Sequence, residues 1–177
     1  MHVYRLIGDE YLFMSISIVK FIGFSGSGKT TLIEKIVKKL SNDGVRVATI
    51  KHDVHGLDID KVGKDSYRYS VAGAKISVVS SPEMAVIKIH KQLSLEDLIA
   101  NVKDVDLIII EGYSSDGKYP TISVARRITG KGVKGDLKKL IAIVSDFTDE
   151  ELNEIGFLGK TYDINDVDGV IDYIYNL

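Results

Sequence analysis

Short apolar runs alternate along the chain with stretches in which apolar and charged residues recur at helical spacing. β-Branched and aliphatic residues dominate the runs, and these predict strands at residues 16–22, 45–50, 76–80, 84–89, 105–110, 121–125 and 140–145. Helical spacing predicts helices at residues 32–40, 65–72, 95–102 and 167–174. Because strands and helices alternate, we expect an α/β fold, a three-layer domain with a mostly parallel central sheet.

The first 13 residues interrupt this regular pattern. Gly8, Asp9 and Glu10 break their apolar stretch, so it does not resemble a secretory signal, and a cleaner strand pattern begins at Met14. We interpret residues 1–13 as an N-terminal extension, which is an extra strand, an arm or a start codon assigned too early. Residues 14–177 contain no internal repeat and no linker, and we expect them to form one domain.

Composition narrows the class of protein. The 23 basic and 25 acidic residues give a net charge of −2, which offers no basic field for nucleic acid. There is no cysteine, which excludes disulfides and thiolate metal sites and fits a reducing compartment. No apolar run approaches the ~20 residues that cross a bilayer. We therefore expect a soluble cytoplasmic protein without a nucleic-acid or membrane partner.

Residues 23–30 read GFSGSGKT and match the phosphate-binding P-loop pattern G-x-x-x-x-G-K-[ST]. A loop that turns its backbone N–H groups toward a triphosphate needs conformations that glycine adopts easily. The small residues Gly26, Ser27 and Gly28 allow the backbone to approach the phosphates closely. A glycine-rich turn without a ligand is the alternative, but a buried strand before the loop and an amphipathic helix after it favour phosphate binding.

The end of this motif supplies the side chains that a nucleotide needs. We expect Lys29 to reach the terminal phosphates, the Thr30 hydroxyl to bind Mg²⁺ and Thr31 to contact the α-phosphate. The helix that starts at Lys29 adds unpaired N–H groups and the positive end of its dipole.

A second metal ligand is predicted at the end of the most aliphatic strand. Asp106 and Glu111 lie at its opposite ends, and α/β sheets bind ligands at the carboxyl edge. We therefore assign Glu111, and not Asp106, to Mg²⁺ or its water shell. A carboxylate that only caps the following turn is the alternative.

The segment after the second strand is rich in polar residues. Cations that could neutralise phosphate charge are Lys51, Lys64 and Arg68. Carboxylates that could position water or Mg²⁺ are Asp58, Asp60 and Asp65, and spacing alone does not rank them. Because a His and Asp pair in a loop is more often a solvated turn, His52 and His55 indicate a transition-metal site only weakly.

Three motifs in one order carry a family resemblance. GFSGSGKTTL, KHDVHGLDIDKVGKDSYRYSVAGA and DLIIIEGY are similar to the molybdopterin-guanine dinucleotide biosynthesis protein B family, and the similarity covers residues 16–177. The P-loop is shared with many nucleotide hydrolases, whereas the second motif is specific. The chain departs from the family pattern in one place, where Val54-His55 replaces two adjacent histidines.

The resemblance implies a GTP-binding accessory protein with weak GTPase activity, using GTP and Mg²⁺. It implies a homodimer that acts beside the guanylyltransferase attaching GMP to molybdopterin, with molybdopterin itself a possible ligand. Under this reading Lys29, Asp60 and Glu111 are the catalytic residues. A looser similarity to dethiobiotin synthetase-like enzymes implies Asp65 as a further Mg²⁺ ligand, unless it caps the helix near Ser66.

Recognition of the base is less defined, because the guanine-reading motif N-K-x-D is absent. Asp146, at the end of a strand, could accept hydrogen bonds from guanine N–H groups, with loop capping as the alternative. The basic stretch that follows the 121–125 strand could contact an anionic pterin phosphate or a partner, although we favour a mobile solvated hairpin; its residues are Arg126, Arg127, Lys131 and Lys134.

A different class of function stays open. A stand-alone ATP-dependent small-molecule kinase, or a dethiobiotin synthetase-like ligase, would also use a P-loop. Such an enzyme normally carries an arginine-bearing lid and an acceptor pocket. No clear lid is evident between Glu111 and Asp146, which favours the accessory role.

Overall fold

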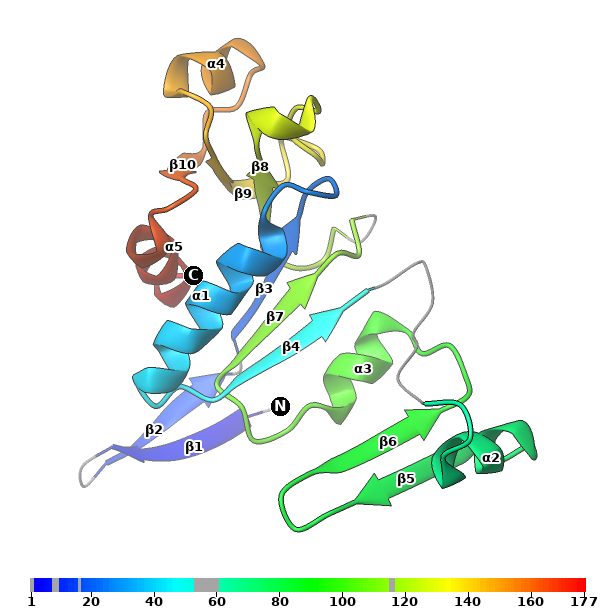
Figure 1. The fold of residues 1–177 in the computed structure, drawn as a ribbon. Helices are drawn as coiled ribbons and strands as arrows, with labels where there is room; N and C mark the ends of the chain where they lie inside the picture. Colours follow the sequence, from blue (N-terminus) through cyan, green and yellow to red (C-terminus); the bar gives the residue numbers. More distant parts are fainter. Residues whose placement is uncertain (1, 8–9, 16, 53–60, 115–116) are drawn as a thin grey trace. The chain divides into compact units, whose positions relative to one another are not determined.

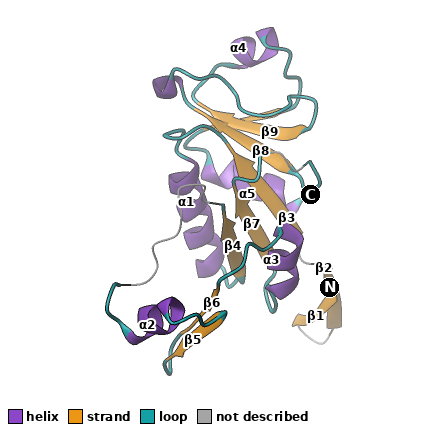
Figure 2. Ribbon diagram, turned by 90° about the vertical axis from the view of Figure 1, so that its right-hand side faces the viewer, coloured by secondary structure: helices purple, strands orange, loops and turns teal. Residues whose placement is uncertain are grey.

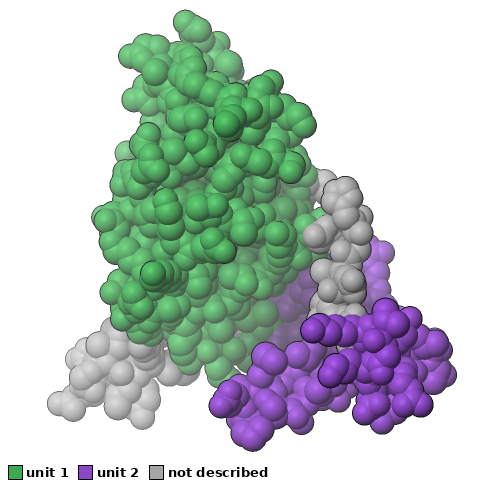
Figure 3. Space-filling model, in the orientation of Figure 1, with its two compact units in different colours: residues 1–52, 102–177 green, residues 53–101 purple. Residues whose placement is uncertain are grey.

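The structure is a computed structural model that describes residues 2–7, 10–15, 17–52, 61–114 and 117–177. The chain divides into two compact units (Figure 3). The first unit comprises residues 1–52 and 102–177, and the second comprises residues 53–101. The prediction that residues 14–177 form one P-loop domain stays a prediction.

A six-stranded sheet forms the centre of the first unit (Figure 1), and its strand order is β10-β9-β8-β3-β7-β4. The strands are β3 (Ser17–Ile22), β4 (Val47–Lys51), β7 (Leu107–Glu111), β8 (Thr121–Ala125), β9 (Leu140–Ser145) and β10 (Lys160–Asp163). Every pairing in this sheet is parallel. The predicted α/β class with a mostly parallel sheet is therefore confirmed. β10 was not predicted, because KTYD has no apolar run.

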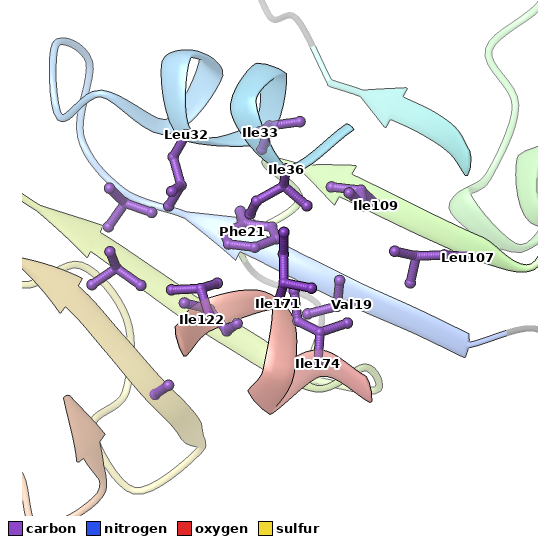
Figure 4. Packing of buried hydrophobic residues seen from close by; sticks show 14 of the residues in the cluster. Val19, Phe21, Leu32, Ile33, Ile36, Leu107, Ile109, Ile122, Ile171 and Ile174 are labelled. Atoms are coloured by element: carbon purple, nitrogen blue, oxygen red, sulfur yellow. The ribbon is translucent and has the colours of Figure 1, made fainter. Parts of the chain in front are cut away.

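One face of this sheet is covered by α1 (Lys29–Asn42) and α5 (Val167–Tyr175). Alternate strand residues such as Val19, Phe21 and Ile109 pack against Ile36 of α1 and Ile174 of α5, all of them 5 % exposed or less (Figure 4). The 3.6-residue period of both helices therefore places their apolar stripes on one core. Asp166 caps α5, since its carboxylate accepts a hydrogen bond from Gly169 N–H at 2.9 Å.

The other face carries a smaller core under the connection from β8 to β9. This connection contains the short 3-10 helix η1 (Arg127–Thr129). Ile22, Leu140 and Ile143 pack there with Leu152 of α4 (Asp149–Glu154) and with Phe157. α4 begins with a capping box between Thr148 and Glu151.

The interpretation of the basic stretch after β8, which includes residues 130–135, as a hairpin is wrong. It belongs to a crossover between two parallel strands, because β8 and β9 run in the same direction. Its backbone is bound to the sheet, since the buried Ser123 hydroxyl donates to the Lys134 carbonyl at 2.8 Å. At Gly135 φ is +110°, a backbone conformation that L side chains rarely adopt and glycine adopts easily. A Cβ there would also lie 2.7 Å from Ile22 Cδ1, the flexible end of a side chain.

The N-terminal extension contains two strands, β1 (His2–Ile7) and β2 (Glu10–Ser15). They pair with each other in an antiparallel two-stranded sheet. β2 continues past residue 13 to Ser15, and the interpretation of residues 1–13 as an N-terminal extension stays a prediction.

The second unit contains α2 (Asp65–Val71), an antiparallel pair formed by β5 (Ile76–Ser80) and β6 (Ala85–Ile89), and α3 (Leu95–Asn101). Each element lies within one or two residues of its predicted range. Ser94 caps α3, since its hydroxyl accepts a hydrogen bond from Asp97 N–H at 3.0 Å. Figure 2 shows the helices and strands of both units.

Candidate functional site

The P-loop connects the end of β3 to the start of α1, as the motif predicts. Gly23 has no space for a side chain, because a Cβ there would lie 2.3 Å from the Val124 carbonyl oxygen. Gly28 adopts the left-handed conformation (φ 86°, ψ 9°) directly before α1. No side chain caps α1 and its first turn carries no acidic residue, so its amide groups face outward without a built-in anion.

The Lys29 ammonium group lies over the loop and donates to the carbonyl oxygens of Gly23 and Phe24, both at 2.9 Å. Its pKa is lowered, chiefly by burial and further by the positive charges of Lys134 and Lys51, while Glu111 acts in the opposite direction. The charge that P-loops use to hold phosphate is therefore present at the centre of the loop. Ser27 lies beside it, and its hydroxyl is buried without a hydrogen-bond partner among the described residues.

The two predicted metal ligands lie together. The Thr30 hydroxyl donates to Glu111 Oε1 at 3.0 Å and lies 3.3 Å from Oε2. Glu111 ends β7, the strand beside β3, and its side chain is 15 % exposed. A hydroxyl and a carboxylate oxygen at this separation fit the all-oxygen coordination of Mg²⁺, with water completing the shell. No cluster of three or more His, Asp or Glu side chains suited to a metal occurs in the described part of the chain.

Residues of both neighbouring strands, β3 and β4, contact Glu111 or support the backbone next to it. Lys51, at the end of β4, places its ammonium group 3.8 Å from Glu111 Oε2. His52 donates its N–H to the Glu111 carbonyl oxygen at 3.0 Å and contacts the Tyr113 ring, with a 4.5 Å centroid separation. Lys20 of β3 is 1 % exposed, and its ammonium group donates to the Tyr113 carbonyl oxygen at 3.2 Å. These contacts fix the backbone that presents the carboxylate.

A cavity of about 380 Å³ adjoins this carboxylate. Its walls come from α1, β4 and β7, and include Thr30, Lys51 and Glu111 at the end near the P-loop. The remaining wall is largely apolar and includes Ile33, Val37 and Ile109.

Asp106, the rejected candidate, has a structural role at the opposite end of the sheet. Its carboxylate accepts hydrogen bonds from the Arg46 guanidinium group at 2.8 and 3.1 Å and from the Arg46 backbone N–H at 2.9 Å. This bidentate pair fixes the chain at the start of β4 and β7.

Asp146 follows β9 and already has partners within the chain. Its Oδ1 accepts the Arg127 backbone N–H at 2.8 Å, and its Oδ2 lies 3.6 Å from Arg126 Nε. The Arg127 guanidinium group is in turn paired with Glu151. The capping role considered for Asp146 is therefore observed, while its role in reading the base stays a prediction.

The remaining predicted residues lie in the second unit, outside the described residues or on α1. Asp65 and Arg68 belong to the second unit, where they form an ion pair at 3.7 Å, and their predicted roles toward Mg²⁺ and phosphate stay predictions. Asp60, together with Asp58 and His55, lies outside the described residues. Thr31 occupies the first turn of α1 and is exposed.

Two neighbours of the site were not singled out from the sequence, and His52 was considered only as a weak transition-metal ligand. Lys20 and His52 support the Glu111 segment, and Phe24 lies under two lysine side chains of the β8–β9 connection. A lysine at an inward position of a central strand was the available signal for Lys20, since charged residues are rarely buried without a partner.

Comparison with known proteins identifies the family. The sequence model of "Molybdopterin guanine dinucleotide synthesis protein B" matches residues 18–146. The molybdopterin-guanine dinucleotide biosynthesis adapter protein of Escherichia coli K12 is 33% identical over 168 residues, which is 90% of this chain and 91% of that protein. The adapter protein of Haemophilus influenzae is 32% identical over 175 residues, or 94% and 93% of the two chains.

Solved structures support the same family assignment. The crystal structure of Bacillus subtilis MobB superposes with a TM-score of 0.72 at 26% identity, and covers 91% of this chain and 97% of that chain. Among the described residues, no helix has the length and apolar character required to cross a bilayer. The family match, the two full-length relatives and the shared P-loop fold give one conclusion: the chain belongs to the molybdopterin-guanine dinucleotide synthesis protein B family.

Proposed function

We propose that this chain is a GTP-binding adapter in the synthesis of molybdopterin-guanine dinucleotide. In this proposal it uses GTP and Mg²⁺, hydrolyses GTP slowly, and acts in the cytoplasm as a homodimer beside the guanylyltransferase that attaches GMP to molybdopterin. The names of the two full-length relatives support the adapter role.

One observation carries the nucleotide part of the proposal. The P-loop holds an ammonium group over its carbonyls at 2.9 Å, and the first turn of α1 follows with neither an acidic residue nor a side-chain cap. A polyphosphate entering this loop would receive backbone N–H groups, the helix dipole and the Lys29 charge together.

The way Glu111 is engaged supports its assignment to Mg²⁺. Both carboxylate oxygens of Glu111 lie within 3.3 Å of the Thr30 hydroxyl, and Lys51 lies 3.8 Å from one of them. A carboxylate held in this way is suited to a metal ion. Bound Mg²⁺ would neutralise phosphate charge, with Thr30 and Glu111 as its protein ligands.

Calorimetric titration with GTP and ATP, each with and without Mg²⁺, tests nucleotide binding. Lys29→Ala should weaken GTP binding about 100-fold, because several charge-assisted hydrogen bonds to phosphate are lost. Lys35→Ala removes an exposed lysine of the same helix and should bind like the unaltered protein. Equal GTP affinity in the two variants would contradict the proposal.

The adapter role needs a separate measurement. Immobilised chain should retain purified molybdopterin guanylyltransferase, more strongly with GTP than without, and Lys29→Ala should lose that GTP dependence. Rapid turnover of ATP with a small acid as acceptor would instead establish the stand-alone kinase or ligase.

A further inference from the structure

Two lysines of the β8–β9 connection point at the P-loop. The ammonium groups of Lys131 and Lys134 lie 5.4 and 5.7 Å from the centroid of the Phe24 ring. Phe24 is the second residue of the P-loop motif, and its carbonyl oxygen is one of the two that accept Lys29. We call residues 130–135 the lysine loop.

The backbone of the lysine loop is fixed at both lysines. Thr129 Oγ1 accepts the Lys131 N–H at 3.2 Å, and its own proton is shared between the carbonyl oxygens of Arg126 at 2.8 Å and Lys131 at 3.1 Å. The buried Ser123 hydroxyl holds the Lys134 carbonyl oxygen at 2.8 Å. A fixed backbone restricts the directions of both side chains, so their approach to Phe24 is a consequence of the fold.

The charge of these lysines is not balanced locally. Within the described part of the chain, neither ammonium group lies within 4.0 Å of a carboxylate. The neighbouring cations differ, since Arg126 is paired with Asp146 and Arg127 with Glu151. Lys134 is also close enough to Lys29 that its charge contributes to the lowered pKa of Lys29. Ammonium groups that repel one another around the P-loop favour the binding of a polyanion.

Strand order places the lysine loop on a defined side. The P-loop follows β3, and β3 lies between β7 and β8. Glu111 ends β7, whereas the lysine loop belongs to the connection that leaves β8. A phosphate chain in the P-loop would therefore have the metal carboxylate on one flank and the two lysines on the other.

We propose that Lys131 and Lys134 form a second cationic wall of the P-loop site and contact the terminal phosphates of a bound nucleoside triphosphate. The inference rests on the proposed nucleotide binding and adds the residues on the β8 flank. In the structure both ammonium groups lie over the Phe24 ring. A charge-assisted contact with phosphate is stronger than a cation–π contact at an exposed ring, so the lysines leave the ring for the phosphate. The lysine of a P-loop reaches the β- and γ-phosphates, and the charge of Lys134 acts on that lysine, Lys29.

Calorimetry of the full chain with Mg²⁺ tests the proposal, with GDP and the slowly hydrolysed analogue GMPPNP as probes. The double variant Lys131→Gln/Lys134→Gln should bind GMPPNP about tenfold more weakly, and GDP about threefold more weakly, because one phosphate fewer is contacted. Lys138→Gln/Lys139→Gln removes the same charge from exposed residues nearby and should match the unaltered protein. Equal affinities of the two double variants for GMPPNP would overturn the proposal.

The outcomes separate this proposal from the nucleotide site itself. If the unaltered chain binds neither probe, the proposed nucleotide binding is wrong. If it binds both, Lys29→Ala weakens binding about 100-fold and the lysine-loop variant binds normally, only the second cationic wall is wrong. Circular dichroism establishes that the double variant is folded. Should it unfold, the single variant Lys131→Gln at an exposed position carries the same test, with about threefold weaker GMPPNP binding expected.

Discussion

The two flanks of the P-loop are organised in opposite ways. On the β7 flank, the Glu111 carboxylate is engaged by Thr30 and Lys51, and buried Lys20 holds the backbone two residues later. On the β8 flank, two ammonium groups lie on an aromatic ring without a carboxylate within 4.0 Å among the described residues.

The difference indicates whether each flank is suited to bind a cation or an anion. A carboxylate and a hydroxyl held together are prepared for a cation, and ammonium groups without counter-charges are prepared for an anion. In the proposed function these partners are Mg²⁺ and the triphosphate of GTP. Four substitutions test the contrast, beginning with the largest expected effect.

Glu111→Gln should abolish the benefit of Mg²⁺ on the β7 flank. Amide oxygen is a weaker ligand than carboxylate, so GTP affinity in the presence of Mg²⁺ should fall about 100-fold. Affinity without Mg²⁺ should hold or rise, because a negative charge near the phosphates is removed. Calorimetry with and without Mg²⁺ measures both, and Glu154→Gln at an exposed position is the control. An unchanged Mg²⁺ dependence would remove Glu111 from the metal site.

Lys20→Met tests whether the β7 flank depends on the hydrogen bond from the buried Lys20 ammonium group to the Tyr113 carbonyl oxygen. The variant leaves the Tyr113 carbonyl oxygen without its ammonium donor, so the free energy of unfolding should decrease by about 2 kcal/mol. Urea unfolding measures the change, and Lys35→Met on the exposed side of α1 is the matched control. A more stable variant would mean that burial of the ammonium group costs more than its hydrogen bonds return.

Asp146→Asn examines base selection beyond the β8 flank. Asparagine retains an oxygen for the Arg127 N–H, so the loop should keep its geometry, whereas guanine loses a charged acceptor. The preference for GTP over ATP should fall about tenfold in competition titrations. Asp172→Asn provides a surface control. An unchanged preference would leave Asp146 with its capping role alone.

Ser123→Ala weakens the support of the lysine loop and should have the smallest effect. Loss of the hydrogen bond to the Lys134 carbonyl oxygen should lower the free energy of unfolding by about 1 kcal/mol. GMPPNP binding should weaken about twofold while GDP binding hardly changes, because the ammonium groups become less restricted. Ser41→Ala on the exposed end of α1 is the control. Equal loss for both nucleotides would indicate a general loosening of the P-loop.

The predicted elements of the fold follow from local patterns. Strands such as 121–125 and 140–145 match the observed β8 and β9 without adjustment, because buried parallel strands are continuous aliphatic runs. β10 and the short helix α4 escaped, since four residues with one aromatic and a six-residue polar helix carry little periodic signal.

The candidate site, like the fold, has features that the sequence predicted and features that it did not. The sequence by itself determined the P-loop and the choice of Glu111 over Asp106, because each depends on residue order and on the end of a strand at which a side chain lies. Only the tertiary structure decided that Lys131 and Lys134 lie over Phe24 and that Lys20 holds Tyr113. These contacts join residues about a hundred positions apart, and strand order in the sheet, which no local pattern encodes, brings them together.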